Sequence, residues 1–232
     1  FGASGSLLAL LAPGLAGARW RKLLLICAFL FPASILGSYL LANYSPFDSY
    51  RIAWEPVQFL YLAGYYLALT CPFFLSGLIV GASLSLEPSR AHAVYASNLL
   101  GSAAGGAAAW GFLPLLGGSG AVVAAAICGL AGAMAFTWPD RKQSWTRTLP
   151  GVSALALAML GICAALRPAF LEIRMSPYKP LSQALRVPGA RLTFTGWNAF
   201  SRVDVVESPT IRSAPGQSLT YPGALPPQAG LL

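Results

Sequence analysis

The stretch from Val57 to Leu86, VQFLYLAGYYLALTCPFFLSGLIVGASLSL, contains no charged residue and decides the fold class of this chain. As an α-helix rising about 1.5 Å per residue, it exceeds the hydrocarbon thickness of a bilayer, which is about 30 Å. A helix of a soluble domain is not uniformly apolar over such a length. We therefore predict a membrane-spanning helix here.

The composition of the whole chain favours the same class. Hydrophobic residues make up 56% of the 232 residues and charged residues 9%. The mean hydropathy is +0.63, which is typical of a protein that crosses the membrane several times. The formal net charge of +8 is explained by basic loops between spans, so we expect the lipid bilayer, and no nucleic acid, as a partner.

Apolar runs separated by charged breaks predict a mainly α fold, with a polytopic bundle of about six transmembrane helices in residues 1–166. Pro32 and Pro72 lie inside the second and third runs and predict bends. The chain opens with Phe inside an apolar run, so we expect a fragment cut at least at its front. The candidate spans are Phe1–Gly17, Leu23–Leu41, Val57–Leu86, Leu99–Gly117, Gly120–Trp138 and Leu149–Leu166.

Alternation of the spans assigns the loops to two sides of the membrane, and the basic residues segregate between them. The two loops on one side carry a single basic residue, Arg51. Because Lys and Arg accumulate in cytoplasmic loops, we expect the other side to be the cytoplasm and the region after Leu166 to lie outside. The loops of the predicted cytoplasmic side carry Arg19, Arg21, Lys22, Arg90, Arg141, Lys142 and Arg147.

The residue types needed for a catalytic or metal site are scarce. The four cysteines, Cys27, Cys71, Cys128 and Cys163, fall in separate apolar runs, which indicates small buried hydrophobes and no disulfide framework or zinc site. His92 is the only histidine and lies in a predicted connector. We therefore predict no catalytic residue and no metal ligand.

The segment Gly101-Ser102-Ala103-Ala104-Gly105-Gly106 contains a Gly-x-x-x-Gly pattern. A phosphate-binding loop needs a preceding strand and usually a following Lys, and neither is present. In an apolar helix, small residues at this spacing allow two backbones to approach closely. We therefore predict helix packing through Gly101 and Gly105.

The composition changes at Arg167, which marks residues 167–232 as a second, water-facing region with β structure. The segments Arg191–Thr195 and Arg202–Glu207 are rich in β-branched residues and predict strands. Ser182–Val187 predicts a short helix. The Pro- and Gly-containing tail Ser208–Leu232 predicts turns.

Several motifs together resemble multi-pass bacterial membrane proteins that carry a spermidine synthase-like domain after their helices. The likeness covers most of the chain and implies a protein of the bacterial inner membrane, linked to polyamine biosynthesis. The motifs are Glu87-Pro88-Ser89-Arg90, Tyr95–Ser102, Leu113-Pro114-Leu115-Leu116-Gly117-Gly118, Ser176–Leu185 and Phe200–Pro209.

The resemblance implies a Rossmann-like transferase domain that binds decarboxylated S-adenosylmethionine, preceded by a small β region. This sequence stops before that core, so we expect an anchor or scaffold that is not catalytic as given. Arg202 stands where the family has a nucleotide-contacting Gln, and Gln228 lies near a second such Gln. Both are candidate cofactor-binding residues, although exposed strand and loop positions explain them equally well. The segment Gly216–Gly223 resembles the family's intervening turn, with Tyr221 in place of Asp.

Two other hypotheses remain open. The helices are a small-solute transporter or channel, or they are an assembly module in which the Gly101–Gly106 face joins two copies in a homo-oligomer. One conflict also stands, because an S-adenosyl substrate is expected in the cytoplasm whereas six spans place the region after Leu166 outside. Either Val57–Leu86 or Leu149–Leu166 is miscounted, or the attached domain performs different chemistry.

Overall fold

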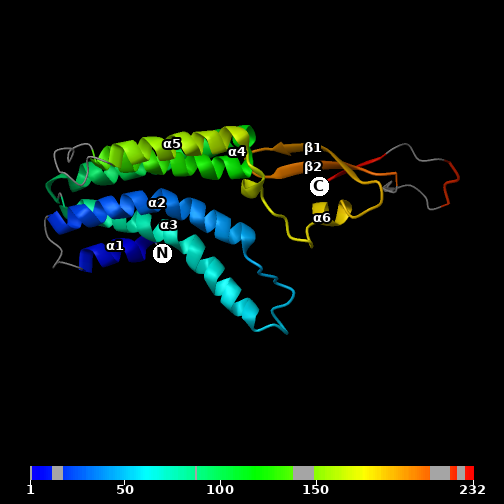
Figure 1. The fold of residues 1–232 in the computed structure, drawn as a ribbon, viewed down its shortest axis with the longest axis horizontal. Coiled ribbons are helices and arrows are strands. Elements are labelled where there is room, and N and C mark those ends of the chain that lie inside the picture. The colour runs from blue at the N-terminus through cyan, green and yellow to red at the C-terminus, as the bar shows by residue number, and fades with distance from the viewer. Residues whose placement is uncertain (1, 12–17, 87, 138–148, 210–219, 224–227) are drawn as a thin grey trace.

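The computed structural model describes residues 2–11, 18–86, 88–137, 149–209, 220–223 and 228–232. Long helices lie side by side in a bundle, and a small sheet extends from one end of it (Figure 1). Within the described residues, three helical stretches are long and apolar enough to cross a membrane, namely Arg21–Tyr44, Val57–Leu86 and Pro88–Thr137. The bundle contains α1 (Gly2–Leu11), α2 (Ala18–Tyr44), α3 (Val57–Leu86), the 3-10 turn Pro88–Arg90, α4 (Ala91–Thr137) and α5 (Leu149–Leu166).

The predicted helical membrane fold is thus confirmed at the level of its long apolar helices. The bounds of α3 and α5 agree with the predicted runs. The first run, Phe1–Gly17, forms the 10-residue α1 in its described part, which is too short to cross a bilayer by itself. Residues 12–17 and Trp138 lie outside the described residues.

The helix α4 combines two of the predicted spans. It is broken at Gly117, whose φ of 71° and ψ of 179° are not helical, and the chain reverses direction there (Figure 1). Glycine suits this position because a residue with a Cβ is strained at positive φ. The first half begins at Ala91 instead of the predicted Leu99, so His92 lies in the first turn of α4 and the prediction of a connector was wrong.

The core of the bundle lies where α1, α2 and α3 meet. Its buried members are Ala9, Leu24, Cys27, Leu75, Leu78 and Ala82. The backbones of α1 and α3 are in close contact, because a Cβ at Gly77 would overlap the carbonyl of Gly2. At Gly81 a Cβ would lie 2.8 Å from the Cα of Ser6. The hydroxyl of Ser6 also donates a hydrogen bond of 2.8 Å to the carbonyl oxygen of Gly77.

The region after α5 contains a three-stranded antiparallel sheet, in the order β1 (Arg191–Trp197), β2 (Arg202–Glu207) and β3 (Ala229–Leu231). The two predicted strands are confirmed, whereas β3 was missed because the tail was predicted to form only turns. The short helix α6 spans Pro180–Ala184, two residues before the predicted start. A 3-10 turn, Ala169–Leu171, connects α5 to this region.

Candidate functional site

The richest polar contacts of the described chain lie at one end of the bundle, which we call the junction. It comprises the end of α2, the loop of residues 45–56, and residues 167–178 after α5. Side chains of α2 bind the backbone of the later segment, because Tyr39 Oη donates to the carbonyl oxygen of Leu171 at 2.6 Å. Tyr44 Oη donates to the carbonyl oxygen of Phe170 at 3.0 Å.

Asn43 of α2 also binds the backbone of the later segment, both as a donor and as an acceptor. Its side-chain Nδ2 donates to the carbonyl oxygen of Glu172 at 2.8 Å, and its Oδ1 accepts from the backbone N–H of Arg174 at 2.7 Å. These groups are available because the backbone leaves the 3-10 turn in an extended conformation at Glu172. Backbone polar groups outside regular structure need such partners. The α2 side chains therefore fix the path of the chain as it leaves the bundle.

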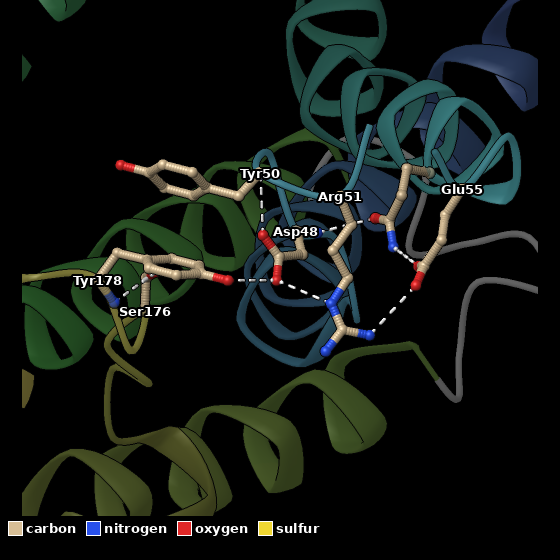
Figure 2. Close-up of polar contacts among 7 residues, drawn as sticks. Asp48, Tyr50, Arg51, Glu55, Ser176 and Tyr178 are labelled. Carbon is tan, nitrogen blue, oxygen red and sulfur yellow. Dashed lines mark hydrogen bonds and ion pairs between the residues drawn. The ribbon is translucent and has the colours of Figure 1, made fainter. Parts of the chain in front are cut away.

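Asp48 is the centre of the second part of the junction (Figure 2). Its Oδ2 accepts a hydrogen bond of 2.8 Å from the hydroxyl of Tyr178 and lies 3.3 Å from Nε of Arg51. Its Oδ1 accepts from the backbone N–H of Tyr50 at 2.9 Å. The rings of Tyr50 and Tyr178 are 4.2 Å apart between centroids.

The network continues from Arg51 to the start of α3. The guanidinium Nη1 of Arg51 lies 3.3 Å from Oε1 of Glu55. The other oxygen of Glu55 accepts from Nε2 of Gln58 at 2.9 Å, and Oε1 of Gln58 accepts from the backbone N–H of Asp48 at 2.8 Å. Gln58 is 3% exposed, so this closed ring of contacts is anchored in the bundle.

The hydrogen bond to Asp48 is also the main reason why the pKa of the Tyr178 phenol is raised above its ordinary value. The negative charge of Asp48 acts in the same direction, whereas Arg51 opposes it. Since the phenol must stay protonated to donate this bond, the contact is present at neutral pH and is lost at strongly alkaline pH.

The sheet docks on the bundle at the break in α4. An added Cβ at Gly117 would lie 3.4 Å from Nε1 of Trp197, and one at Gly118 would lie 2.8 Å from its Cη2. Trp197 is the last residue of β1, and its ring lies against both glycines. The rings of Trp110 and Phe200 add an edge-to-face contact with 5.9 Å between centroids. The motif Leu113–Gly118 is therefore the point where the helices hold the β region.

The predicted cofactor-binding residues, Arg202 and Gln228, are not brought together. Arg202 begins β2, and its Nε lies 2.9 Å from Oδ2 of Asp204, which is 3% exposed. Gln228 precedes β3, whose Ala229 pairs with Glu207 at the opposite end of β2. The separation along the strand is about 20 Å at 3.3 Å per residue. A ligand role for either residue stays a prediction, and residues 216–219 of the adjoining motif lie outside the described residues.

The predicted packing glycines, Gly101 and Gly105, make no close contact within the described chain. A Cβ at either position would meet no heavy atom within 4 Å. A close approach of two helix backbones occurs instead at Gly77 and Gly81 of α3, which sequence reasoning missed. They form the same Gly-x-x-x-Gly pattern, so the signal was present. Packing of Gly101 and Gly105 against a second copy stays a prediction.

No protein-family model matches this chain, and neither a curated protein nor a solved structure shows significant similarity to it. The structure itself defines a mainly helical chain with three stretches of membrane-spanning length and a small antiparallel sheet held at one end.

Proposed function

We propose that this chain is the membrane anchor and scaffold of a spermidine synthase-like integral membrane protein. Its helices cross the bacterial inner membrane several times, in about six spans, and carry the β region that precedes a Rossmann-like transferase domain. The membrane part of this proposal is supported by the long apolar helices. The transferase part, with decarboxylated S-adenosylmethionine as co-substrate, is supported by the motifs from Glu87 to Pro209.

The observation that carries the scaffold role is the junction. Bonds from Tyr39, Asn43 and Tyr44 to the backbone of residues 170–174 join segments that are more than 120 residues apart in sequence. Tyr178 and Trp197 add contacts further along the chain. A simple tether needs no such contacts, whereas a scaffold that sets the position of a following domain does.

The junction also bears on the orientation. It places the loop of residues 45–56 and the region after Leu166 at the same end of the bundle. Arg90, which belongs to the basic loops, lies beyond the other end of α3. The loop that carries Arg141, Lys142 and Arg147 lies outside the described residues. If the basic loops are cytoplasmic, the β region faces away from the cytoplasm, where an S-adenosyl substrate is expected.

Two measurements test the proposal. The first uses a variant without native cysteines and with one new cysteine, either Ser182→Cys in α6 or His92→Cys at the start of α4. A membrane-impermeant maleimide should label intact cells at Ser182→Cys only, and the His92→Cys variant serves as the matched control. Labelling in the opposite pattern would refute the orientation.

The second measurement is spermidine formation from putrescine and decarboxylated S-adenosylmethionine in membranes that contain the protein expressed from the full reading frame. The transferase part predicts product in these membranes and none in membranes that lack the protein. Product together with external labelling of Ser182→Cys would show that the S-adenosyl substrate reaches the outer face. Absence of product from well-folded, membrane-inserted protein would refute the transferase part. The anchor role would then be tested by the labelling experiment alone.

A further inference from the structure

A groove lies between α2 and α3 and is closed from behind by the second half of α4. Its volume is about 700 Å³. Figure 1 shows that α2 and α3 diverge towards the junction, and the groove is lined by residues 31–43 of α2 and 65–76 of α3. On α2 it extends from Phe31 to Asn43, which corresponds to about 18 Å of helix at 1.5 Å per residue. Pro72 of α3 is also part of its wall.

The chemistry of the groove differs between its two ends. The deep part is lined by apolar side chains such as Phe31, Leu69 and Val122. Asn43 and Arg174 lie at the end next to the junction. No acidic residue is among the described residues that line the groove.

Arg174 is the cation at the mouth of this groove. Its guanidinium carbon lies 3.9 Å from the centroid of the Tyr44 ring. Within the described part of the chain, no ion pair joins it to a carboxylate. The amide of Asn43 is already bonded to backbone groups on both sides. The mouth therefore presents a positive charge at the end of an apolar channel, at the depth where the helices meet the water-facing region.

The dimensions restrict what the groove holds. A volume of about 700 Å³ over about 18 Å corresponds to a mean cross-section of about 40 Å². A helix is about 10 Å across, or about 80 Å² in cross-section, which is about twice the mean cross-section of the groove. A single hydrocarbon chain is narrower than a helix and suits an apolar channel of this length.

We propose that this groove binds one acyl chain of an anionic membrane phospholipid, with the lipid phosphate at the guanidinium of Arg174. Charge complementarity selects an anionic lipid over a zwitterionic one, because no acidic residue among the described ones lines the groove and Arg174 forms no ion pair with a described carboxylate. The stacking on Tyr44 holds the guanidinium in place without neutralising it. This site does not depend on the spermidine synthase-like assignment.

The first test is native mass spectrometry of the intact chain in mild detergent, after incubation with phosphatidylglycerol or with phosphatidylcholine of the same acyl composition. We expect phosphatidylglycerol to be retained several-fold more strongly. Arg174→Gln should lower its retention about fivefold, which is the contribution of one interfacial cation to anionic lipid binding. Arg191→Gln, at an exposed site on β1, is the matched control and should change nothing.

A second pair of variants tests the channel itself. Ala125 lines the groove, and Ala125→Phe should fill it and reduce retention of both lipids. Ala131→Phe places the same side chain on an exposed position of the same helix and should leave retention unchanged. A phosphatidylglycerol with a photoreactive acyl chain should label peptides of α2 and α3 that line the groove.

Equal retention of the two lipids would overturn the proposal, as would full retention by either Arg174→Gln or Ala125→Phe. If Ala125→Phe does not fold, the comparison of Arg174→Gln with Arg191→Gln decides the outcome. Crosslinks from α2 and α3 to a second copy of the chain, in place of lipid, would also overturn it.

Discussion

Replacement of Gly77 by Ala should destabilise the packing of α1 on α3, whereas the same replacement at Gly101 should not. A Cβ at Gly77 would overlap the backbone carbonyl of Gly2, and no rotamer change relieves an overlap with backbone. The neighbouring glycine shows how tight this interface is. A Cβ at Gly81 would lie 2.8 Å from Cα of Ser6 and 3.0 Å from Cβ of Ala9.

The magnitude follows from the separation that the new methyl group requires. Ordinary contacts at a Cβ are 3.4–4 Å, and a Cβ at Gly77 would lie far inside this range of the Gly2 carbonyl, so α1 and α3 must move apart by more than about 1 Å. That separation forfeits at least half of each dispersion contact. Overpacking of this kind costs about 1–3 kcal/mol. The hydrogen bond from Ser6 to Gly77, worth about 0.6 kcal/mol in a membrane, also weakens.

Helix propensity acts in the opposite direction, because Ala is favoured over Gly by up to about 1 kcal/mol inside a helix. For Gly77→Ala the net effect should be a loss of about 1–2 kcal/mol in the free energy of unfolding. At Gly101 and Gly105 nothing opposes the propensity gain, so these variants should be unchanged or more stable by up to about 1 kcal/mol.

The assay is reversible unfolding in mixed micelles of increasing SDS fraction, followed by circular dichroism, at protein concentrations low enough to keep the chain monomeric. The midpoint should fall for Gly77→Ala and stay or rise for Gly101→Ala. A Gly77→Ala variant as stable as the parent chain would show that α1 and α3 do not pack as described. A Gly101→Ala variant that loses stability only at high protein concentration would instead place Gly101 at a contact between copies.

Three further outcomes are expected. Gly118→Ala should weaken docking of the sheet by about 1 kcal/mol, because the methyl group displaces the ring of Trp197, and limited proteolysis after residue 166 should become faster. Arg202→Gln should cost about 1–3 kcal/mol by leaving the buried carboxylate of Asp204 without its cation, seen as faster amide exchange in β1 and β2; unchanged exchange would contradict this. The hydrogen bond to Asp48 raises the pKa of Tyr178 in the folded protein. This hydrogen bond therefore stabilises the folded protein fully below the pKa of the unfolded chain, and the stabilisation is lost as pH rises through the folded pKa. The difference in phenolate absorbance between the parent chain and Tyr178→Phe reports the ionisation of Tyr178. It should therefore appear at a higher pH than the phenolate absorbance of free tyrosine.

The helices were predictable wherever charge and proline mark their ends. α3 runs between Pro56 and Glu87-Pro88, and both of its bounds agree with the apolar run. The start of α4 was misplaced because residues 91–98 contain His92 and Asn98, which resemble a connector. Such polar residues are compatible with a helix end at a membrane surface, and the helix continues through them.

The junction was not predictable from sequence, because its acceptors are backbone carbonyls that any residue could supply. Tyr39, Asn43 and Tyr44 lie near the end of α2. Their spacing shows only that Tyr39 and Asn43 share a side of the helix and that Tyr44 lies about 100° further round it. Their partners lie more than 120 residues later. The strand β3 was missed for a related reason, since Ala229–Leu231 is too short to show alternation and is paired through β2.

The break at Gly117 connects the long apolar helices to the β region. Positive φ at Gly117 reverses α4, and the missing side chain at Gly118 leaves room for Trp197 and Ile173. The guanidinium of Arg167 donates to the carbonyl oxygen of Leu115 at 3.2 Å, which ties the end of α5 to the same place. A change that alters the path of α4 at this turn must therefore also move the sheet. The position of the β region relative to the helices is therefore set by the turn at Gly117, and the proposed scaffold role requires such a coupling.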